Sequence, residues 1–208
     1  EYLTRRGGRA IREADVVVGF ETVVEFVRDE IDGEPLTCGY EDEPEVLAAS
    51  ADRIAGGASG TAVLMGDPNH SGYQFPGKVE STVDAPVRLI PGISSLQIAA
   101  SRARTPMEST TFVTLHKSGP IEEDLRRLER DVGEKHLLVL PRPFDWMPER
   151  IAHRLLESGA SDRDALVCER LTHDDESITR TSLSALAADI DSKAETMFSD
   201  LSVLAVRQ

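Results

Sequence analysis

The sequence contains few lysines, cysteines and aromatic residues, and it has no long apolar run. Only four of its 23 basic residues are lysine, and aromatic residues make up 5% of its 208 positions. No apolar run approaches the roughly 18 to 20 residues of a membrane-spanning helix. We therefore expect a soluble, cytoplasmic protein that has no membrane partner.

Cysteine and histidine are also too sparse to build a stapled or metal-bound fold. Cys38 and Cys168 are the only cysteines, and they lie far apart beside apolar sequence. They form no disulfide framework and no CxxC pair, and the five histidines show no HExxH or paired-ligand spacing. We expect two buried thiols in a reducing compartment and no bound metal.

Acidic residues outnumber basic ones by 37 to 23, which gives a formal net charge of -14 and a pI near 4.8. This charge disfavours non-specific binding to nucleic acid, so we expect no nucleic-acid partner. An acidic, lysine-poor composition suggests adaptation to high salt, as in a halophilic, haloarchaeal protein. The alternative is an ordinary acidic cytosolic protein.

Short apolar runs alternate with helical patterns along the chain, which is typical of an α/β fold with mostly parallel sheets. Helical periodicity is clearest over residues 44–57, 93–103, 121–132 and 148–159. The apolar runs predict strands at 14–20, 34–38, 60–66, 85–92, 110–116, 135–141, 165–171, 177–183 and 201–206.

The alternation is weakest at "RARTPMEST", residues 102–110, where a helical pattern ends in Thr-Pro and polar residues. We place a domain boundary there, which gives an N-terminal α/β domain over 1–106 and a C-terminal α/β domain over 107–208. The opening segment "EYLTRRGGRAIREA" is helix-like and has no strand before it. We expect that something N-terminal to Glu1 is missing from this sequence.

Three polar loops follow predicted strands, and open α/β sheets bind ligands at that end of their strands. They are "GDP" at 66–68, "PGISS" at 91–95 and "ERLTHDDE" at 169–176. Their small and polar residues let backbone amides approach a ligand closely. Each loop also has a purely structural interpretation, since Asp67 suits a turn before Pro68, and Ser94 or Ser95 suits a helix cap.

Taken together and in order, these motifs resemble the tetrapyrrole (corrin/porphyrin) methylase family. More narrowly, they resemble its cobalt-precorrin-7 C(5)-methyltransferases, which are homologous to the N-terminal half of precorrin-6Y C(5),C(15)-methyltransferase. "PGISSLQIAASR" and "ERLTHDDESITR" are the most specific parts, and the resemblance covers essentially all 208 residues. It implies the two-domain class III methyltransferase fold, with S-adenosylmethionine in the interdomain cleft.

The resemblance also assigns residues to the cofactor by matching motifs. Gly66 would let backbone come close, while Asp67 would fix the loop or reach polar ligand atoms. The serines of the second motif would line the methionine or sulfonium end, Leu140 and Pro141 the linker side, and the third motif the adenine. The implied cofactor-binding residues are Gly66, Asp67, Pro68, Ser71, Ser94, Ser95, Leu140, Pro141, Leu171 and Thr172.

A corrin precursor carries several carboxylates, which the planar guanidinium of arginine can bind bidentately. Basic residues at or near the implied cleft are therefore substrate candidates, although each could also be an ordinary surface residue: Arg5, Arg6, Lys117 and Arg142. The sequence identifies no catalytic residue. His116 and Glu169 could act as a general base, and a structural role is the alternative for both.

One departure from the family is the absence of its "GxGPGDP"-like loop, which precedes a segment like "EYLT" in relatives. The resemblance implies a homodimer of stand-alone methyltransferases that passes its product to a separate C(15)-methyltransferase/decarboxylase. Two alternatives stay open. One is a same-fold methylase acting on another acceptor, such as another tetrapyrrole carbon, a diphthine precursor or rRNA. The other is a non-catalytic cofactor-binding module.

Overall fold

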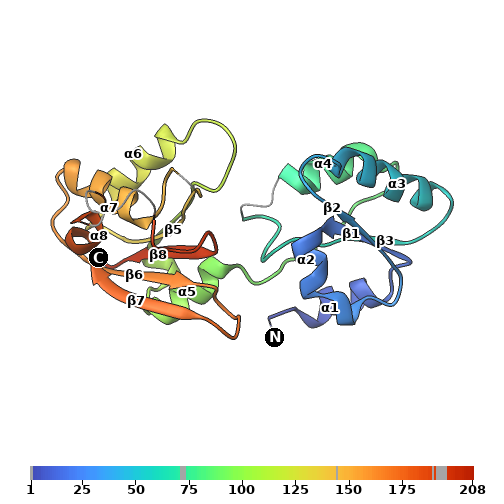
Figure 1. Cartoon of the computed structure of the whole chain (residues 1–208), viewed down its shortest axis with the longest axis horizontal. Coiled ribbons are helices and arrows are strands. Elements are labelled where there is room, and N and C mark those ends of the chain that lie inside the picture. The colour runs from blue at the N-terminus through green and yellow to red at the C-terminus, as the bar shows by residue number, and fades with distance from the viewer. Residues whose placement is uncertain (1, 71–73, 144, 189, 191–195) are drawn as a thin grey trace. The chain divides into compact units, whose positions relative to one another are not determined.

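The computed structural model of the chain describes residues 2–70, 74–143, 145–188, 190 and 196–208 (Figure 1). The chain divides into two compact units, Glu1–Ser94 and Ser95–Gln208. The sequence placed the boundary twelve residues later, at 106/107. The difference lies in helix α5 (Ser95–Ala103), which shares a hydrophobic cluster with Leu138 and Ala205 of the second unit.

The first unit is built on a parallel sheet of three strands in the order β2-β1-β3. These are β1 (Val16–Phe20), β2 (Glu34–Cys38) and β3 (Gly60–Ala62), and Val16 lies opposite both Glu34 and Gly60. The centre of β1 is buried on both sides, which explains its unbroken run of valines.

Helices cover both faces of this sheet, as Figure 1 shows. On one face lie α1 (Arg5–Arg12) and α2 (Glu21–Phe26), and on the other lie α3 (Glu43–Ala55) and α4 (Gln74–Thr82). A short 3-10 turn, η1 (Arg28–Glu30), follows α2. The two faces have separate cores, made of Ile11, Ala14, Val17, Val24 and Val63 on the first and of Val18, Cys38, Leu47, Phe75 and Val79 on the second.

The strand predicted over residues 85–92 is wrong, because none of these residues joins a ladder with a described strand. Pro86 and Pro91 lack the backbone N–H that a ladder requires. Residues 85–89 are exposed, including Val87 and Leu89. The apolar residues of this segment therefore predicted a strand where the chain runs as an irregular connection.

The second unit contains a five-stranded sheet in the order β4-β5-β8-β6-β7. The strands are β4 (Thr110–Thr114), β5 (His136–Leu140), β6 (Asp164–Glu169), β7 (Ser177–Ser182) and β8 (Ser202–Val206). Only β4 and β5 pair in parallel, whereas β8 runs antiparallel to both of its neighbours and β7 antiparallel to β6. This sheet is mixed. The expectation of mostly parallel strands therefore holds for the first unit but not for the second.

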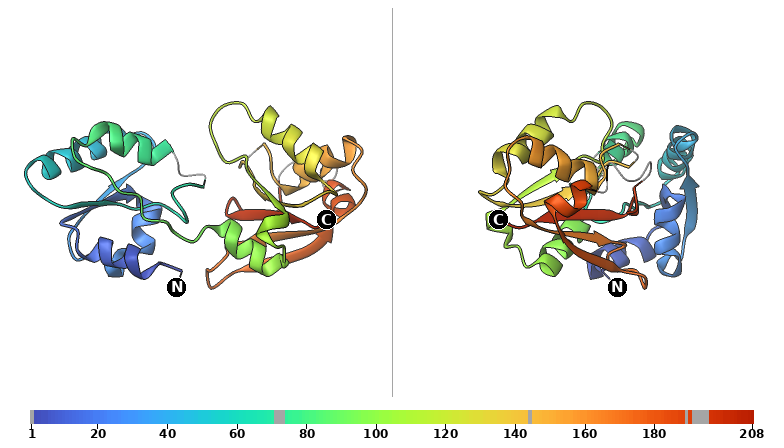
Figure 2. Two further views of the ribbon diagram at one scale, coloured as in Figure 1. Left: turned by 180° about the vertical axis from the view of Figure 1, so that it is seen from behind. Right: turned by 60° about the vertical axis from the view of Figure 1, so that its left-hand side comes forward.

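Helices α6 (Glu122–Asp131), α7 (Pro148–Glu157) and α8 (Leu183–Ala188) cover one face of the second sheet, and α5 covers the other. The reverse view in Figure 2 shows this division. A 3-10 turn, η2 (Met107–Ser109), leads from α5 into β4. The larger core contains Leu125, Ile151 and Leu204, all of which are almost completely buried.

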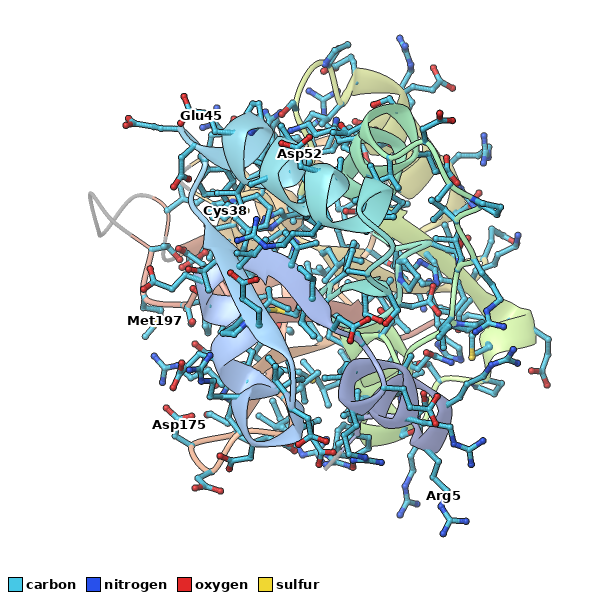
Figure 3. All side chains as sticks on the ribbon, turned by 90° about the vertical axis from the view of Figure 1, so that its right-hand side faces the viewer. Arg5, Cys38, Glu45, Asp52, Asp175 and Met197 are labelled. Atoms are coloured by element: carbon cyan, nitrogen blue, oxygen red, sulfur yellow. The ribbon has the colours of Figure 1, made fainter. Side chains whose placement is uncertain are left out.

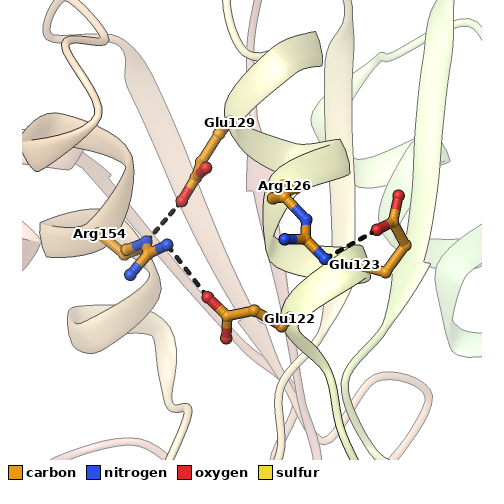
Figure 4. Close-up of polar contacts among 5 residues, drawn as sticks. All are labelled: Glu122, Glu123, Arg126, Glu129 and Arg154. Atoms are coloured by element: carbon orange, nitrogen blue, oxygen red, sulfur yellow. Dashed lines mark hydrogen bonds and ion pairs between the residues drawn. The ribbon is translucent and has the colours of Figure 1, made fainter.

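Ion pairs form within α6 and between α6 and α7 (Figure 4). Arg154 contacts both Glu129 and Glu122, and Arg126 lies 3.0 Å from Glu123. These arginines offset part of the acidic first turn of α6. Exposed pairs of this kind contribute about 0.2 to 1 kcal/mol each, so they adjust rather than determine the fold.

Both cysteines are buried and unbridged, as the sequence predicted. Burial raises the pKa of the Cys168 thiol to about 11, and burial followed by the charge of Glu43 raises that of Cys38. Neither thiol is therefore activated as a nucleophile. Among the described residues, no helix is both long enough and apolar enough to cross a membrane.

Candidate functional site

The GDP loop follows β3 and is held by a single carboxylate. Asp67 Oδ1 accepts hydrogen bonds from the backbone N–H and the side-chain amide of Asn69, at 2.8 and 2.9 Å. Its other oxygen, Oδ2, accepts from the backbone N–H of Gly92 at 2.9 Å. Two of the predicted motifs, 25 residues apart, therefore lie side by side in the first unit.

The Asp67 side chain is nearly buried, and burial alone would raise its pKa. The hydrogen bonds from Asn69 and Gly92, together with the charge of His70, outweigh burial and hold the pKa below its usual value. Asp67 is thus an ionised loop clamp at neutral pH. Of the two roles considered from the sequence, the structure displays the loop-fixing one.

The two loops touch closely enough to require glycine. Gly66 has φ +73°, a conformation that favours glycine, and a Cβ on Gly92 would lie 2.0 Å from the Gly66 carbonyl oxygen. Pro68 and Ser94, each two residues along the chain from one of these glycines, are buried. Ser95 begins α5. Ser71, the remaining candidate from the first unit, lies outside the described residues.

The candidate residues of the second unit lie at the ends of β5 and β6, the two strands that flank β8 in the sheet. Leu140 ends β5 and the next residue, Pro141, is buried, while Leu171 and Thr172 follow β6 after Arg170. Leu140 and Leu171 belong to the same hydrophobic cluster, so the structure brings these two predicted residues together. Thr172 is exposed and has φ +75°, which costs about 1 to 2 kcal/mol for a residue with a Cβ.

A charged contact that the sequence did not predict fixes the Thr172 loop. Glu176 accepts a hydrogen bond from the Thr172 backbone N–H at 2.9 Å, and it binds Arg102 Nε at 2.6 Å and Nη2 at 3.2 Å. The hydrogen bonds from Arg102 and then from Thr172 lower the pKa of Glu176. This pair joins "PGISSLQIAASR" to "ERLTHDDESITR" across 74 residues, and opposite charges in the two motifs were its only sequence signal.

The basic candidates differ in how they are engaged. Arg142 is held bidentately by Asp145, at 2.8 and 2.6 Å, and also donates to the Gly119 carbonyl oxygen. Lys117 lies 2.6 Å from Asp124. Arg5 and Arg6 lie on the exposed side of α1 without an ion pair to any described residue, and Figure 3 shows Arg5 pointing away from the ribbon.

Neither candidate base has the environment of a preformed proton acceptor. His116 is exposed after β4, and Glu169 accepts a hydrogen bond from the Ser199 backbone N–H at 2.9 Å. Two other side chains have polar atoms that no described residue satisfies. Buried hydroxyls of Thr114, at the end of β4, and Ser202, at the start of β8, have no hydrogen-bond partner in the described part of the chain.

Comparison with known proteins identifies a family. Residues 1–187 match the family model described as Tetrapyrrole (Corrin/Porphyrin) Methylases. The chain is 28% identical over 193 residues to a probable cobalt-precorrin-7 C(5)-methyltransferase of Methanocaldococcus jannaschii, an alignment that covers 90% of this chain and 86% of that protein.

Solved structures share the fold. The methyltransferase CobJ superposes with a TM-score of 0.77 at 19% identity, covering 100% of this chain and 88% of the other. Uroporphyrin-III C-methyltransferase of Thermus thermophilus, solved in complex with S-adenosylhomocysteine, superposes with a TM-score of 0.72 at 23% identity. That superposition covers 98% of this chain and 85% of the other.

Proposed function

Because the chain belongs to the tetrapyrrole (corrin/porphyrin) methylase family, we propose that it is an S-adenosylmethionine-dependent methyltransferase of cobalamin biosynthesis that methylates C(5) of cobalt-precorrin-7. The match to the family model over 187 residues carries the proposal. The choice of acceptor rests on the relative from Methanocaldococcus jannaschii and on the motifs shared with that branch.

The residues present fit the cofactor. In the loop after β3, the contact between Gly66 and Gly92 leaves no room for a side chain at Gly92, so backbone alone lies there. In the second unit, the buried Thr114 hydroxyl has no partner among the described residues, and Thr114 lies opposite Leu140, which packs in one cluster with Leu171. Backbone amides, hydroxyls and apolar surface suit a ligand that joins an amino acid to a nucleoside.

When bound, S-adenosylmethionine supplies an electrophilic methyl group on a sulfonium, so the protein needs no nucleophile of its own. The chain has to hold the acceptor carbon in line with that group and to exclude water. Asp67 fixes the GDP loop against Gly92, and Glu176 fixes the Thr172 loop. Both carboxylates act through other residues, so we regard them as positioning residues.

The substrate carboxylates need cations that are not already committed. Of the four candidates, Arg5 and Arg6 meet this requirement best, since neither pairs with a described carboxylate, whereas Arg142 and Lys117 each hold a carboxylate of the chain itself. Binding at Arg142 would have to displace Asp145 or share its guanidinium. We therefore expect an Arg5→Ala, Arg6→Ala variant to raise the Michaelis constant for the corrinoid more than it lowers turnover.

Calorimetric titration with S-adenosylhomocysteine tests the cofactor site. The Gly92→Ala variant should bind at least tenfold more weakly than the wild type, because its Cβ would displace the GDP loop. The matched control is Gly77→Ala, since a Cβ at Gly77 meets no described atom within 4 Å beyond its chain neighbours and the backbone of its own helix. Absence of binding by the folded wild type would refute the methyltransferase proposal.

Labelled S-adenosylmethionine then tests the acceptor. Incubation with purified cobalt-precorrin-7 should place the label on C(5). A second candidate is methylation of another tetrapyrrole carbon, favoured by a 24% identity over 146 residues to a probable cobalt-factor III C(17)-methyltransferase of Methanothermobacter thermautotrophicus. That alignment covers 68% of this chain and 42% of the relative. Label at a different ring carbon would decide for this candidate, and label on RNA or protein would exclude both.

A further inference from the structure

Three aromatic rings gather where β1 and β2 end. Phe20 closes β1, opposite Cys38 at the end of β2, and Tyr40 follows two residues later. The ring centroids of Phe20 and Tyr40 are 5.0 Å apart, and those of Phe20 and Phe75 are 5.5 Å apart, both in tilted geometry. A chain with only 5% aromatic residues therefore concentrates three of them at one point of the first unit.

The three rings differ widely in how much of each is exposed to solvent. Phe75 is buried in the core between α4 and the sheet, Phe20 is half-buried, and Tyr40 is 88% exposed. Tyr40 is the most exposed large apolar side chain of the described residues. Because the hydrophobic contribution to folding scales with the area removed from water, the Tyr40 ring contributes little to stability.

The surroundings hold this exposed ring in place. The backbone N–H of Gly39 donates to Asp42 Oδ1 at 2.6 Å, which closes the turn that carries Tyr40. Directly after this turn, the buried carboxylate of Glu43 binds Lys78 of α4 at 2.7 Å. Phe75, which also lies on α4, packs against the Phe20 ring. The aromatic surface is thus preorganised, which lowers the entropy loss of ligand binding.

We propose that the exposed Tyr40 ring, supported at 5.0 Å by the tilted ring of Phe20, forms a stacking platform for the macrocycle of the substrate. The ligand class rests on the proposed function, and the placement rests on the two rings at the carboxyl ends of parallel strands, where α/β sheets bind ligands. Aromatic faces attract planar conjugated rings of any substitution pattern. The platform accordingly serves affinity for the macrocycle rather than choice of the methylated carbon.

The acidic residues around the platform predict how binding depends on salt concentration. The exposed Glu41 and Asp42 follow Tyr40 directly, whereas Glu43 is paired with Lys78, and the whole chain carries a net charge of -14. The exposed carboxylates of Glu41 and Asp42 repel substrate carboxylates close to Tyr40, so attraction at this ring itself has to come from stacking. Added salt screens the repulsion, and binding at this platform should therefore tighten as salt rises.

Uroporphyrin III, a planar tetrapyrrole that carries eight carboxylates, is a suitable probe. Its absorption and fluorescence should be followed during titration with protein in 1 M potassium chloride. We expect Tyr40→Ala to weaken binding about five- to tenfold and Tyr40→Phe to bind within twofold of the wild type. The matched control is Phe26→Ala at the end of α2, an exposed aromatic outside the platform, which should bind as the wild type does.

Calorimetry with S-adenosylhomocysteine on the same samples separates this proposal from the proposed function. Equal cofactor binding by all four proteins, with porphyrin binding weakened about five- to tenfold only in Tyr40→Ala, supports the platform. Porphyrin binding by Tyr40→Ala within twofold of the wild type, no binding by the wild type, or weaker binding at higher salt would each overturn the platform while cofactor binding stands. Loss of cofactor binding in the wild type would instead refute the methyltransferase.

Discussion

Replacing Asp67 by alanine should release the two loops of the first unit from each other. The substitution removes the acceptor of three hydrogen bonds, two from Asn69 and one from Gly92. Asn69 is exposed, so water can satisfy its donors, whereas the half-buried Gly92 amide loses its partner. Hydrogen bonds to charged groups contribute about 1.5 to 3 kcal/mol. We take about 2 kcal/mol for the local loss of stability.

Hydrogen exchange at the Gly92 amide measures this loss directly. A local loss of about 2 kcal/mol corresponds to a roughly 30-fold decrease in the protection factor. The expected decrease should be confined to the two loops, while the amides of β1 keep their protection. Asn69→Ala is the control, because it leaves the bond from Gly92 to Asp67 intact.

The same bond should depend on pH in a defined direction. The pKa of Asp67 is lower in the folded protein than in the unfolded chain, so its contribution is present above about pH 4 and is lost as pH falls through the folded value. Asp67→Asn should show no such loss. Gly92 protection in Asp67→Ala within twofold of the wild type, or protection in the wild type that is unchanged at acid pH, would refute the reasoning.

Two further predictions concern the Arg102–Glu176 ion pair and the net charge of the whole chain. Glu176→Gln should lower the free energy of unfolding of the second unit by about 1 to 2 kcal/mol, whereas Glu123→Gln, in an exposed pair, should lower it by less than about 0.5 kcal/mol. Urea unfolding followed by Trp146 fluorescence compares them, and equal losses would contradict a special role for Glu176. Because repulsion within a chain of net charge -14 is screened by salt, the melting temperature should rise between ~0.1 M and ~2 M potassium chloride. A flat or falling melting temperature would exclude the proposed adaptation to salt.

Local periodicity predicted most of the secondary structure. The segment 148–159, with Pro at its start and Gly at its end, contains α7 at Pro148–Glu157. The valine run after Ala14 becomes β1, because a central parallel strand is buried on both faces. In both cases the pattern of apolar residues reflects contacts that the element itself makes with its sheet.

The remaining features depend on partners distant in sequence. Residues 85–92 have the apolar content of a strand, but a strand exists only where a neighbour accepts its hydrogen bonds. The pairing of Arg102 with Glu176 spans 74 residues and follows from the packing of α5 on the second sheet. Likewise, the sequence pointed to Asp67 through its motif, while its bond to Gly92 required the fold.

The edges of the two sheets have a consequence for solubility at high ionic strength. At about 1 M salt the Debye length is only about 3 Å, so net charge no longer keeps molecules apart. Exposed strand edges could then pair between copies and nucleate aggregates. On β2, the Glu34 N–H bonds toward β1, so Pro35 removes a donor from the free edge, and the Glu34 side chain is bound by Arg53. Most of β7 is polar, with Arg180 exposed. The β2 and β7 edges therefore discourage self-association by their chemistry under conditions in which electrostatic repulsion between molecules is lost.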